Sequence, residues 1–435
     1  IFLLCTIIIV KAVKKRVGQM TTQIFIYELK RPGCDLLKLK RVDDEFVLVT
    51  THSNFAQYTD EDKANFDRIE LIEDFKKEQV YAAVAKIVAN TEPNDIRIIC
   101  GTEMVIQMCA LVRAEFGLAG DDLEYALRFS NKFIAKQKLH GSAVRVPAYQ
   151  IYDPIAYKND NVDYIDALES TLGYPMFVKP TDLYCAIDSV KIGDRSDLQA
   201  WLDDHKEPKH IYEIDEFISG DLYHCDSLIE GEEILYSLLG EYAWPCDFFA
   251  KGYPLGSIVV PPDSEKFNRL NAFNKAVLTC MQPRNCATHL EIFEKEDRQL
   301  YFLEMGARPP AGPIVPLYAM QWQLDMNLMH YASQLGIKCQ QQPLSNPERY
   351  YAWAYFPITV GTIKKINRLE LKSKMDFKLF VDVGDHFSVD YFVRDEIMFL
   401  PKYIAGQVFF SHNDYDQLYA DFETVRNFKL LEYED

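Results

Sequence analysis

Two kinds of pattern alternate in the hundred residues after Met20, and this alternation limits the fold more than any other feature of the chain. Residues 23–28, 45–51 and 96–101 (QIFIYE, EFVLVTT and IRIICG) are short, apolar and rich in β-branched and aromatic residues, as in buried strands. Residues 73–90 and 102–117 repeat apolar residues at helical spacing. Strand–helix alternation predicts a parallel sheet with helices on its faces. No GxGxxG follows the first strand, so the dinucleotide-binding fingerprint is absent.

The middle and end of the sequence predict helices mixed with mostly antiparallel strands. One amphipathic helix is expected to end at His140–Gly141, and Ser196 and Gln199 have capping-box spacing at the start of another. The predicted helices cover residues 121–139, 162–173, 196–205, 324–336 and 414–427. The predicted strands cover residues 175–180, 210–218, 222–229, 232–242, 288–293, 299–305 and 406–411, with a further strand from Val190.

The first ten residues, IFLLCTIIIV, form an apolar run that precedes the basic stretch KAVKKR. A spanning helix needs roughly twenty apolar residues, and a secretory signal carries its charge before the apolar run. Met20 opens MTTQIFIYE, which has the form of a natural start before a first strand. We expect residues 1–19 to be an extension outside the fold, with a short membrane anchor as the alternative.

The charge and the cysteines narrow the class of protein. The formal net charge of −18 argues against nucleic acid or an anionic membrane as the main partner, because both need a basic surface. A local basic pocket for a phosphorylated ligand stays compatible with it. The ten cysteines include no CxxC pair, and a chain of 435 residues has no need of disulfides, so we expect reduced thiols and a cytoplasmic protein.

The segment HLEIFEKEDRQLYFLEMGARPPAG (289–312) carries the strongest chemical signal. Glu291 and Glu304 flank a short hairpin, and an even loop would place them on one face as direct or diagonal neighbours. Two half-buried carboxylates repel unless a cation joins them, and Mg²⁺ accepts such ligands together with phosphate oxygens. The alternative is a solvent-facing pair on an edge hairpin.

Four basic side chains could complete such a site. Arg308 stands on a rigid Pro/Gly-rich turn, which suits bidentate capture of a carboxylate or phosphate. His289 falls on the same face as Glu291. Lys179 lies in an apolar strand where an unpaired ammonium is costly, and Lys132 lies in an amphipathic helix. The alternatives are a surface arginine, a structural histidine and a lysine that reaches the strand end.

Together these residues resemble the ATP-grasp superfamily, and most closely its ATP-dependent carboxylate–amine ligases of the amino-acid or dipeptide kind. The resemblance implies an N-terminal parallel α/β domain and two α+β units that clasp ATP. It implies that Lys132 and Lys179 contact the ATP phosphates. It also implies Mg²⁺ at Glu291 and Glu304, with Mn²⁺ as a substitute, and substrate capture at Arg308. The segment YEIDEFISG resembles the adenine-binding hinge, with Asp215, Glu216, Phe217 and Ile218 around the base.

The resemblance also suggests a division of the chain. The expected parts are residues 1–19 outside the fold, an N-terminal α/β domain (20–120), a small or lid subdomain (121–211), a large subdomain with the metal site (212–345), and a C-terminal α+β portion packed on the core (346–435).

Several positions depart from the family pattern. Tyr184 and Asp188 occupy glycine positions of the phosphate lid, which we place at residues 181–189. Leu222 replaces the acidic residue that often binds the ribose. Gly306 replaces an asparagine, as in relatives with a similar ending. His289 stands where many ligases place an arginine over the reacting phosphoryl group.

The predicted function is an ATP-dependent ligase that joins a small carboxylate to an amine through an acyl phosphate. Positioning and charge neutralisation carry such a reaction. The alternatives are a nucleotide-binding or interaction protein without catalysis on this fold, favoured by Tyr184, Asp188 and Leu222, and a carboxylase-type subunit. The oligomeric state is open, with a homodimer as one option.

Overall fold

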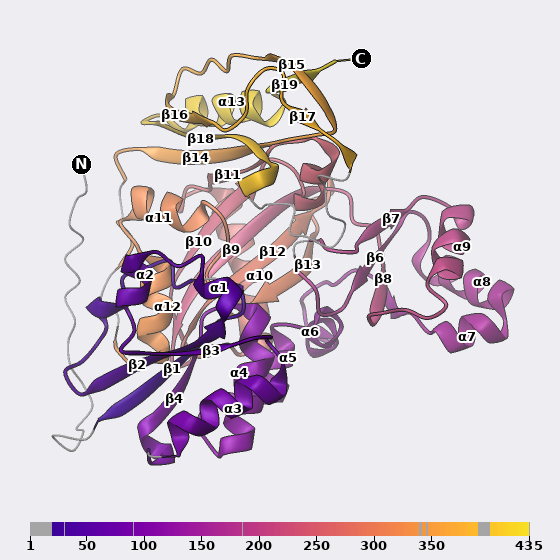
Figure 1. The fold of residues 1–435 in the computed structure, drawn as a ribbon. Helices are drawn as coiled ribbons and strands as arrows, with labels where there is room; N and C mark the ends of the chain where they lie inside the picture. Colours follow the sequence, from indigo (N-terminus) through magenta and orange to yellow (C-terminus); the bar gives the residue numbers. More distant parts are fainter. Residues whose placement is uncertain are drawn as a thin grey trace.

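The structure is a computed structural model that describes residues 20–29, 31–89, 91–184, 186–338, 342–344, 347–389 and 401–434. The expected extension at residues 1–19 lies outside the described residues. The described residues form two four-stranded sheets, one eight-stranded sheet and one three-stranded sheet, with helices between them (Figure 1).

The N-terminal sheet confirms the parallel arrangement that the sequence predicts. Its strands run in the order β3-β2-β1-β4 and all pair in parallel. They are β1 (Thr21–Ile26), β2 (Asp44–Thr51), β3 (Arg68–Ile72) and β4 (Ile96–Cys100), with the short helices α1 (His52–Phe55) and α2 (Asp60–Ala64) beside them.

Helices from distant parts of the sequence cover the two faces of this sheet. Because strand side chains alternate, Ile24 and Ile26 pack in one core with α3 (Lys77–Val88) and α4 (Ile106–Phe116). Phe25 and Tyr27 point the other way, into a second core that includes α12 (Met326–Gln334). The α12 helix lies in sequence between β13 (Leu300–Gly306) and β14 (Tyr350–Pro357) of the eight-stranded sheet, so it fastens the N-terminal sheet to that sheet.

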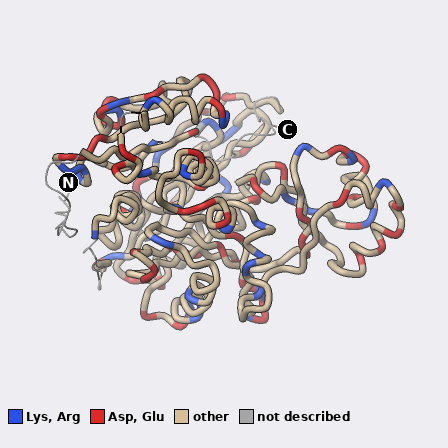
Figure 2. Tube along the Cα trace, turned by 90° about the horizontal axis from the view of Figure 1, so that it is seen from below, with Lys and Arg blue, Asp and Glu red and all other residues tan. Residues whose placement is uncertain are grey.

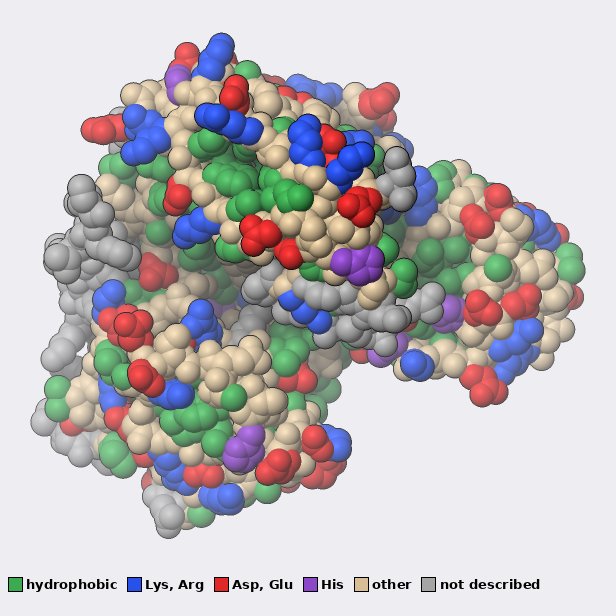
Figure 3. Space-filling model, turned by 45° about the horizontal axis from the view of Figure 1, so that its top comes forward, with side chains coloured by type: hydrophobic (Ala, Val, Ile, Leu, Met, Phe, Trp, Pro, Cys, Tyr) green, Lys and Arg blue, Asp and Glu red, His purple; other side chains and the backbone are tan. Residues whose placement is uncertain are grey.

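Residues 149–216 form an arm that stands out from the rest of the molecule (Figures 1 and 3). Its antiparallel sheet has the order β5-β8-β6-β7. Three helices pack with it around one apolar core. The elements are β5 (Tyr149–Ile151), α7 (Pro154–Asn159), α8 (Asn161–Leu172), β6 (Met176–Pro180), β7 (Val190–Ile192), α9 (Arg195–Asp204) and β8 (Tyr212–Glu216).

Three sequence predictions about this part of the chain are corrected. The strand expected at 210–218 was grouped with the large antiparallel unit, but as β8 it pairs with β5 and β6 of the arm. The single helix expected at 121–139 is two helices, α5 (Leu123–Arg128) and α6 (Lys132–Leu139), because Asn131 caps the second by accepting from Ile134 N at 3.0 Å. Asp194, and not Ser196, caps α9.

The large sheet has the order β13-β12-β9-β10-β11-β14-β18-β16. Its strands are β9 (Asp221–Glu230), β10 (Glu233–Tyr242), β11 (Leu255–Val259), β12 (Cys286–Glu294), β13 (Leu300–Gly306), β14 (Tyr350–Pro357), β16 (Lys374–Leu379) and β18 (Ile404–His412). The C-terminal strands therefore extend the same sheet that contains the predicted hairpin. A three-stranded sheet of β15 (Gly361–Ile366), β17 (His386–Phe387) and β19 (Leu431–Tyr433) lies beside it in the C-terminal part.

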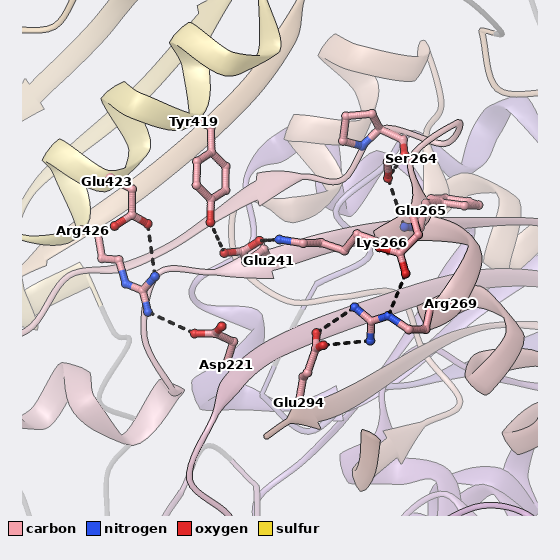
Figure 4. A network of polar contacts seen from close by, with 12 residues as sticks. Asp221, Glu241, Ser264, Glu265, Lys266, Arg269, Glu294, Tyr419, Glu423 and Arg426 are labelled. Atoms are coloured by element: carbon pink, nitrogen blue, oxygen red, sulfur yellow. Dashed lines mark hydrogen bonds and ion pairs between the residues drawn. The ribbon is translucent and has the colours of Figure 1, made fainter. Parts of the chain in front are cut away.

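Besides α12, the helices that pack on the large sheet include α10 (Glu265–Met281), α11 (Ile314–Trp322) and α13 (Tyr415–Arg426). A polar network joins α10 and α13 through the sheet (Figure 4). The buried Glu241 of β10 pairs with Lys266 of α10 at 2.5 Å and accepts from the hydroxyl of Tyr419 of α13 at 2.9 Å. The C-terminal helix is thereby held on the same face as α10.

Lys and Arg are interspersed with Asp and Glu over the chain, without a separate basic face in this view (Figure 2). The described cysteines are free thiols: Cys34, Cys100, Cys109, Cys225, Cys246, Cys280 and Cys286. Among the helices of the described ranges, none has the length and apolar character required to cross a membrane.

Candidate active site

The β12–β13 hairpin brings the two predicted carboxylates onto one face. Glu291 is the direct register partner of Glu304, and the register shifts immediately after Glu291. His289 lies two residues earlier on β12, and its Nε2 is 3.5 Å from Oε1 of Glu291. The geometric expectation of a shared face is therefore confirmed.

Lys132 links this hairpin to the lid. Its Nζ is 3.3 Å from Oε2 of Glu304 and donates to the carbonyl of Leu183, and its backbone N donates to Thr181 O at 2.8 Å. Burial would raise the pKa of Glu304, but Lys132, Lys179 and Arg308 outweigh burial and lower it. Glu304 is thus held as a carboxylate among cations.

Arg308 has an acidic partner from the N-terminal domain that the sequence did not reveal. Its Nε is 2.9 Å from Oε1 of Glu103, which opens the 3₁₀ turn Glu103–Val105 before α4. A Cβ placed on Gly306 would come within 2.6 Å of the other carboxylate oxygen of Glu103. The absence of a side chain at 306 therefore leaves room for this carboxylate beside the hairpin.

Lys179 lies in a buried cluster of two lysines and two carboxylates. Its Nζ is 3.4 Å from Glu213 and 3.1 Å from Asp215. Lys136 of α6, which the sequence reading did not single out, lies 3.0 Å from Glu213 and 2.5 Å from Asp215. Burial alone would lower the pKa of Lys179, but Asp215 and Glu213 raise it, whereas burial dominates at Lys136 and lowers its pKa. The Asp215 side chain is committed to this cluster.

The remaining hinge residues lie at the end of β8 and directly after it. Glu216 accepts from Ala148 N at 2.9 Å, and the Phe217 ring lies 4.0 Å from Lys191 Nζ. Ile218 and Leu222 are buried. These contacts join the hinge to the arm and to the large sheet.

The lid between β6 and β7 keeps its bend without glycine. Ala186 and Asp188 both take left-handed backbone angles, with φ of 55° and 54°. The Asp188 carboxylate accepts from the hydroxyl of Tyr212, and Tyr184 lies in the pocket described below. Asp188 is therefore directed to β8.

A buried network stands behind His289. Nδ1 of His289 lies 2.6 Å from Asp226, and Nδ1 of His224 lies 2.7 Å from the same carboxylate. Burial would lower the pKa of His289, but Asp226 raises it to about 9. Burial would raise the pKa of Asp226, but both histidines lower it. The sequence reading missed Asp226 and His224, although two polar residues alternating on an apolar strand are a usable signal.

One pocket gathers four of the predicted site residues: Lys132, His289, Glu304 and Arg308. Glu103 of the N-terminal domain and Tyr184 of the lid also line it. Lys179, Glu291 and the hinge residues 215–218 are not part of its lining. The pocket therefore lies where the N-terminal domain, α6, the lid and the β12–β13 hairpin meet.

Comparisons with known proteins find a similar ligase sequence and similar enzyme structures. The L-arginine-specific L-amino acid ligase of Bacillus subtilis is 24% identical over 336 residues, which cover 73% of this chain and 77% of that protein. The crystal structure of the L-amino acid ligase from Bacillus licheniformis superposes with a TM-score of 0.64 at 16% identity, over 96% of this chain and all of that one.

The biotin carboxylase domain of 2-oxoglutarate carboxylase from Hydrogenobacter thermophilus, solved with MgADP and bicarbonate, has a TM-score of 0.59 at 12% identity, over 96% of this chain and 91% of that one. No protein-family profile matches the chain. The chain has the ATP-grasp fold and resembles the ATP-dependent carbon–nitrogen ligases of that superfamily.

Proposed function

We propose that this protein is an ATP-dependent carboxylate–amine ligase that activates its acid as an acyl phosphate. The observation that supports this proposal most is the cross-strand pair Glu291–Glu304. Glu304 lines a pocket together with Lys132, His289 and Arg308. The relative named as an L-amino acid ligase supports an amino acid as a substrate.

The donor set fits a hard divalent ion. Glu291 and Glu304 would hold Mg²⁺, or Mn²⁺ in its place, since carboxylates on one face repel without a cation. Such an ion would neutralise charge on the transferred phosphoryl group. The neighbouring structure solved with MgADP supports this assignment.

In the first step, a carboxylate oxygen of the acid attacks the γ-phosphorus of ATP, and ADP leaves. Lys132 and Lys179 bind the phosphates, Arg308 holds the acid, and His289 lies beside the reacting group. In the second step, the amine attacks the acyl carbon, phosphate leaves, and the amine loses a proton to solvent. The four cationic side chains stabilise the negative charge that develops in the transition states of both steps.

Lys179 must exchange partners for this role. In the present structure its ammonium contacts Glu213 and Asp215. Lys136 contacts the same two carboxylates, so it can balance part of their charge when Lys179 turns to a phosphate. We propose that residues 215–218 border the adenine. The side chain of Asp215 stays paired with the buried Lys136.

We also propose that the substrates are a small-molecule acid and a small-molecule amine, and that the protein is cytoplasmic. We further propose a homodimer, which a molar mass from light scattering would test. The neighbouring structure described as a dimer supports the last point.

The test is ADP release by the purified protein with ATP, Mg²⁺ and pairwise panels of amino acids. We expect at least one pair to stimulate release, and Glu304→Gln to lower the rate about 10²-fold because one carboxylate of the metal pair is lost. Glu296→Gln, in the exposed hairpin turn, is the matched control and should leave the rate unchanged.

The panel also separates the alternatives. MgATP binding without ADP release for any pair would favour a non-catalytic nucleotide-binding protein, which the lid residues Tyr184 and Asp188 make the second candidate. Stimulation by bicarbonate alone would favour carboxylase-type chemistry. A Glu304→Gln variant that turns over and binds MgATP like the parent would contradict the metal assignment.

A further inference from the structure

Asp226 of β9 is the centre of a polar network inside the large sheet. It is fully buried, and its carboxylate accepts from Nδ1 of His289 at 2.6 Å and from Nδ1 of His224 at 2.7 Å. The hydroxyl of Tyr318, on α11, donates to the same carboxylate. A buried carboxylate with three donors is fixed in position.

His224 is itself locked in place. Its Nε2 lies 2.7 Å from Ser257 Oγ on β11. A Cβ on Gly240 would come within 2.2 Å of the same nitrogen, so the ring occupies space that only glycine leaves open on β10. The network therefore reaches across four strands, and its other end is His289 Nε2, 3.5 Å from Glu291.

The side chains of His224, Asp226 and His289 are also close enough to one another to be considered as metal ligands. Two ligand atoms on a tetrahedral ion, each at about 2.0 to 2.1 Å, lie about 3.3 Å apart. The distances of 2.6 and 2.7 Å are shorter than that and are those of charge-assisted hydrogen bonds. The geometry thus favours a hydrogen-bonded triad over a metal centre.

We propose that Asp226 is a positioning residue, which holds the His289 ring so that Nε2 faces the carboxylate hairpin and the pocket. This inference rests on the proposed function. An imidazole ring has two broad orientations about its last torsion, and only one of them directs Nε2 to the hairpin. Asp226 selects that orientation through Nδ1, and His224, Ser257 and Tyr318 hold Asp226.

The experiment compares Asp226→Ala, Asp226→Asn, His289→Ala and the Asp226→Ala/His289→Ala double variant in substrate-stimulated ADP release. We expect Asp226→Ala to lower kcat about 10²-fold, as a misplaced reacting group does, with the KM for MgATP changed less than about twofold. Asp226→Asn keeps a carbonyl acceptor for His289 and should recover part of kcat. In the His289→Ala background, Asp226→Ala should have no further effect.

The matched control is His330→Gln. His330 is also a buried histidine that hydrogen-bonds β12, through Ala287 N, but it belongs to α12 and lies outside the triad. It should keep the parental kcat. If Asp226→Ala does not fold, as judged by thermal unfolding, Asp226→Asn and Ser257→Ala take its place, each with an intermediate loss of kcat expected.

Three results would overturn the inference. The first is a parental kcat in Asp226→Ala, and the second is an equal effect of Asp226→Ala with and without His289. The third is stoichiometric metal in the purified parent that is lost in Asp226→Ala. These results require an active parent protein, whereas an inactive parent would overturn the proposed function, so the two failures are distinguishable.

Discussion

Buried charge is concentrated at Lys136, Lys179, Glu213 and Asp215, and each lysine is shared by both carboxylates. Such clusters are costly to form, but removing one member is worse because it leaves charge without a partner. The cluster lies where α6 meets the arm. Its interaction energy therefore affects both the stability of the fold and the position of Lys179 in the candidate site.

We predict that Lys136→Met destabilises the protein by about 3 to 5 kcal/mol, because two buried carboxylates would then share one lysine. Urea unfolding followed by circular dichroism measures this. Lys138→Met, an exposed lysine of the same helix, is the control and should change stability by less than about 0.5 kcal/mol. Equal stability of the two variants would show that the cluster contributes no net energy.

At the scale of elements, α12 joins the N-terminal sheet to the large sheet through His330. Its Nδ1 accepts from Ala287 N of β12 at 3.0 Å, and its Nε2 donates to Cys100 O of β4 at 2.9 Å. This pattern requires the neutral ring, and burial lowers the pKa of His330 from 6.5 to about 4.

We predict a loss of stability in acid that depends on this histidine. The unfolded chain binds the proton near pH 6.5 and the folded chain only near pH 4, so this contribution is complete above pH 6.5 and is lost as the pH falls toward 4. The shift corresponds to about 3 kcal/mol. Urea unfolding at several pH values should give a shallower pH dependence for His330→Gln, whereas the exposed His386→Gln should retain the parental slope. The same slope in all three proteins would rule out His330 as the source.

Sequence patterns anticipated elements whose signal is local. Three strands of the parallel sheet, the β12–β13 hairpin and the pairing of Glu291 with Glu304 follow from residue alternation over a few positions, whereas β3 was not predicted. The break at Asn131 was missed because residues 121–139 keep helical spacing on both sides of the cap. The assignment of β8 to the arm was missed because an isolated strand carries no information about its partners.

The missed site residues share a different cause. Glu103 reaches Arg308 across about two hundred positions of sequence, and Lys136 meets Glu213 across 77 positions. Their partners are set by how the N-terminal domain, α6 and the arm dock, which no local pattern encodes. The resemblance to a known fold supplied positions for the lysines and carboxylates, but not this second set of contacts.

At the largest scale, the candidate site lies where the arm meets the N-terminal domain and the large sheet. The arm stands apart from the body (Figure 1), and Lys132 connects the two by binding the lid carbonyl of Leu183 and Glu304 of β13. A nucleotide bound between the lid and the hairpin would add further contacts across the same gap. Closure of the arm is then favoured by the difference in affinity between the open and closed forms.

We predict that MgATP draws the arm toward the body and lowers the radius of gyration measured by small-angle X-ray scattering. Lys132→Met removes the ammonium that joins the lid to β13. The radius of gyration of this variant should therefore decrease less than that of the parent. Both are measured at MgATP concentrations that calorimetry shows to be saturating. Lys138→Met is again the matched control and should behave as the parent does. If saturating MgATP leaves the radius of gyration of the parent unchanged, the arm is already in its ligand-bound position. Lys179 would then need to reach the phosphates by side-chain rotation alone.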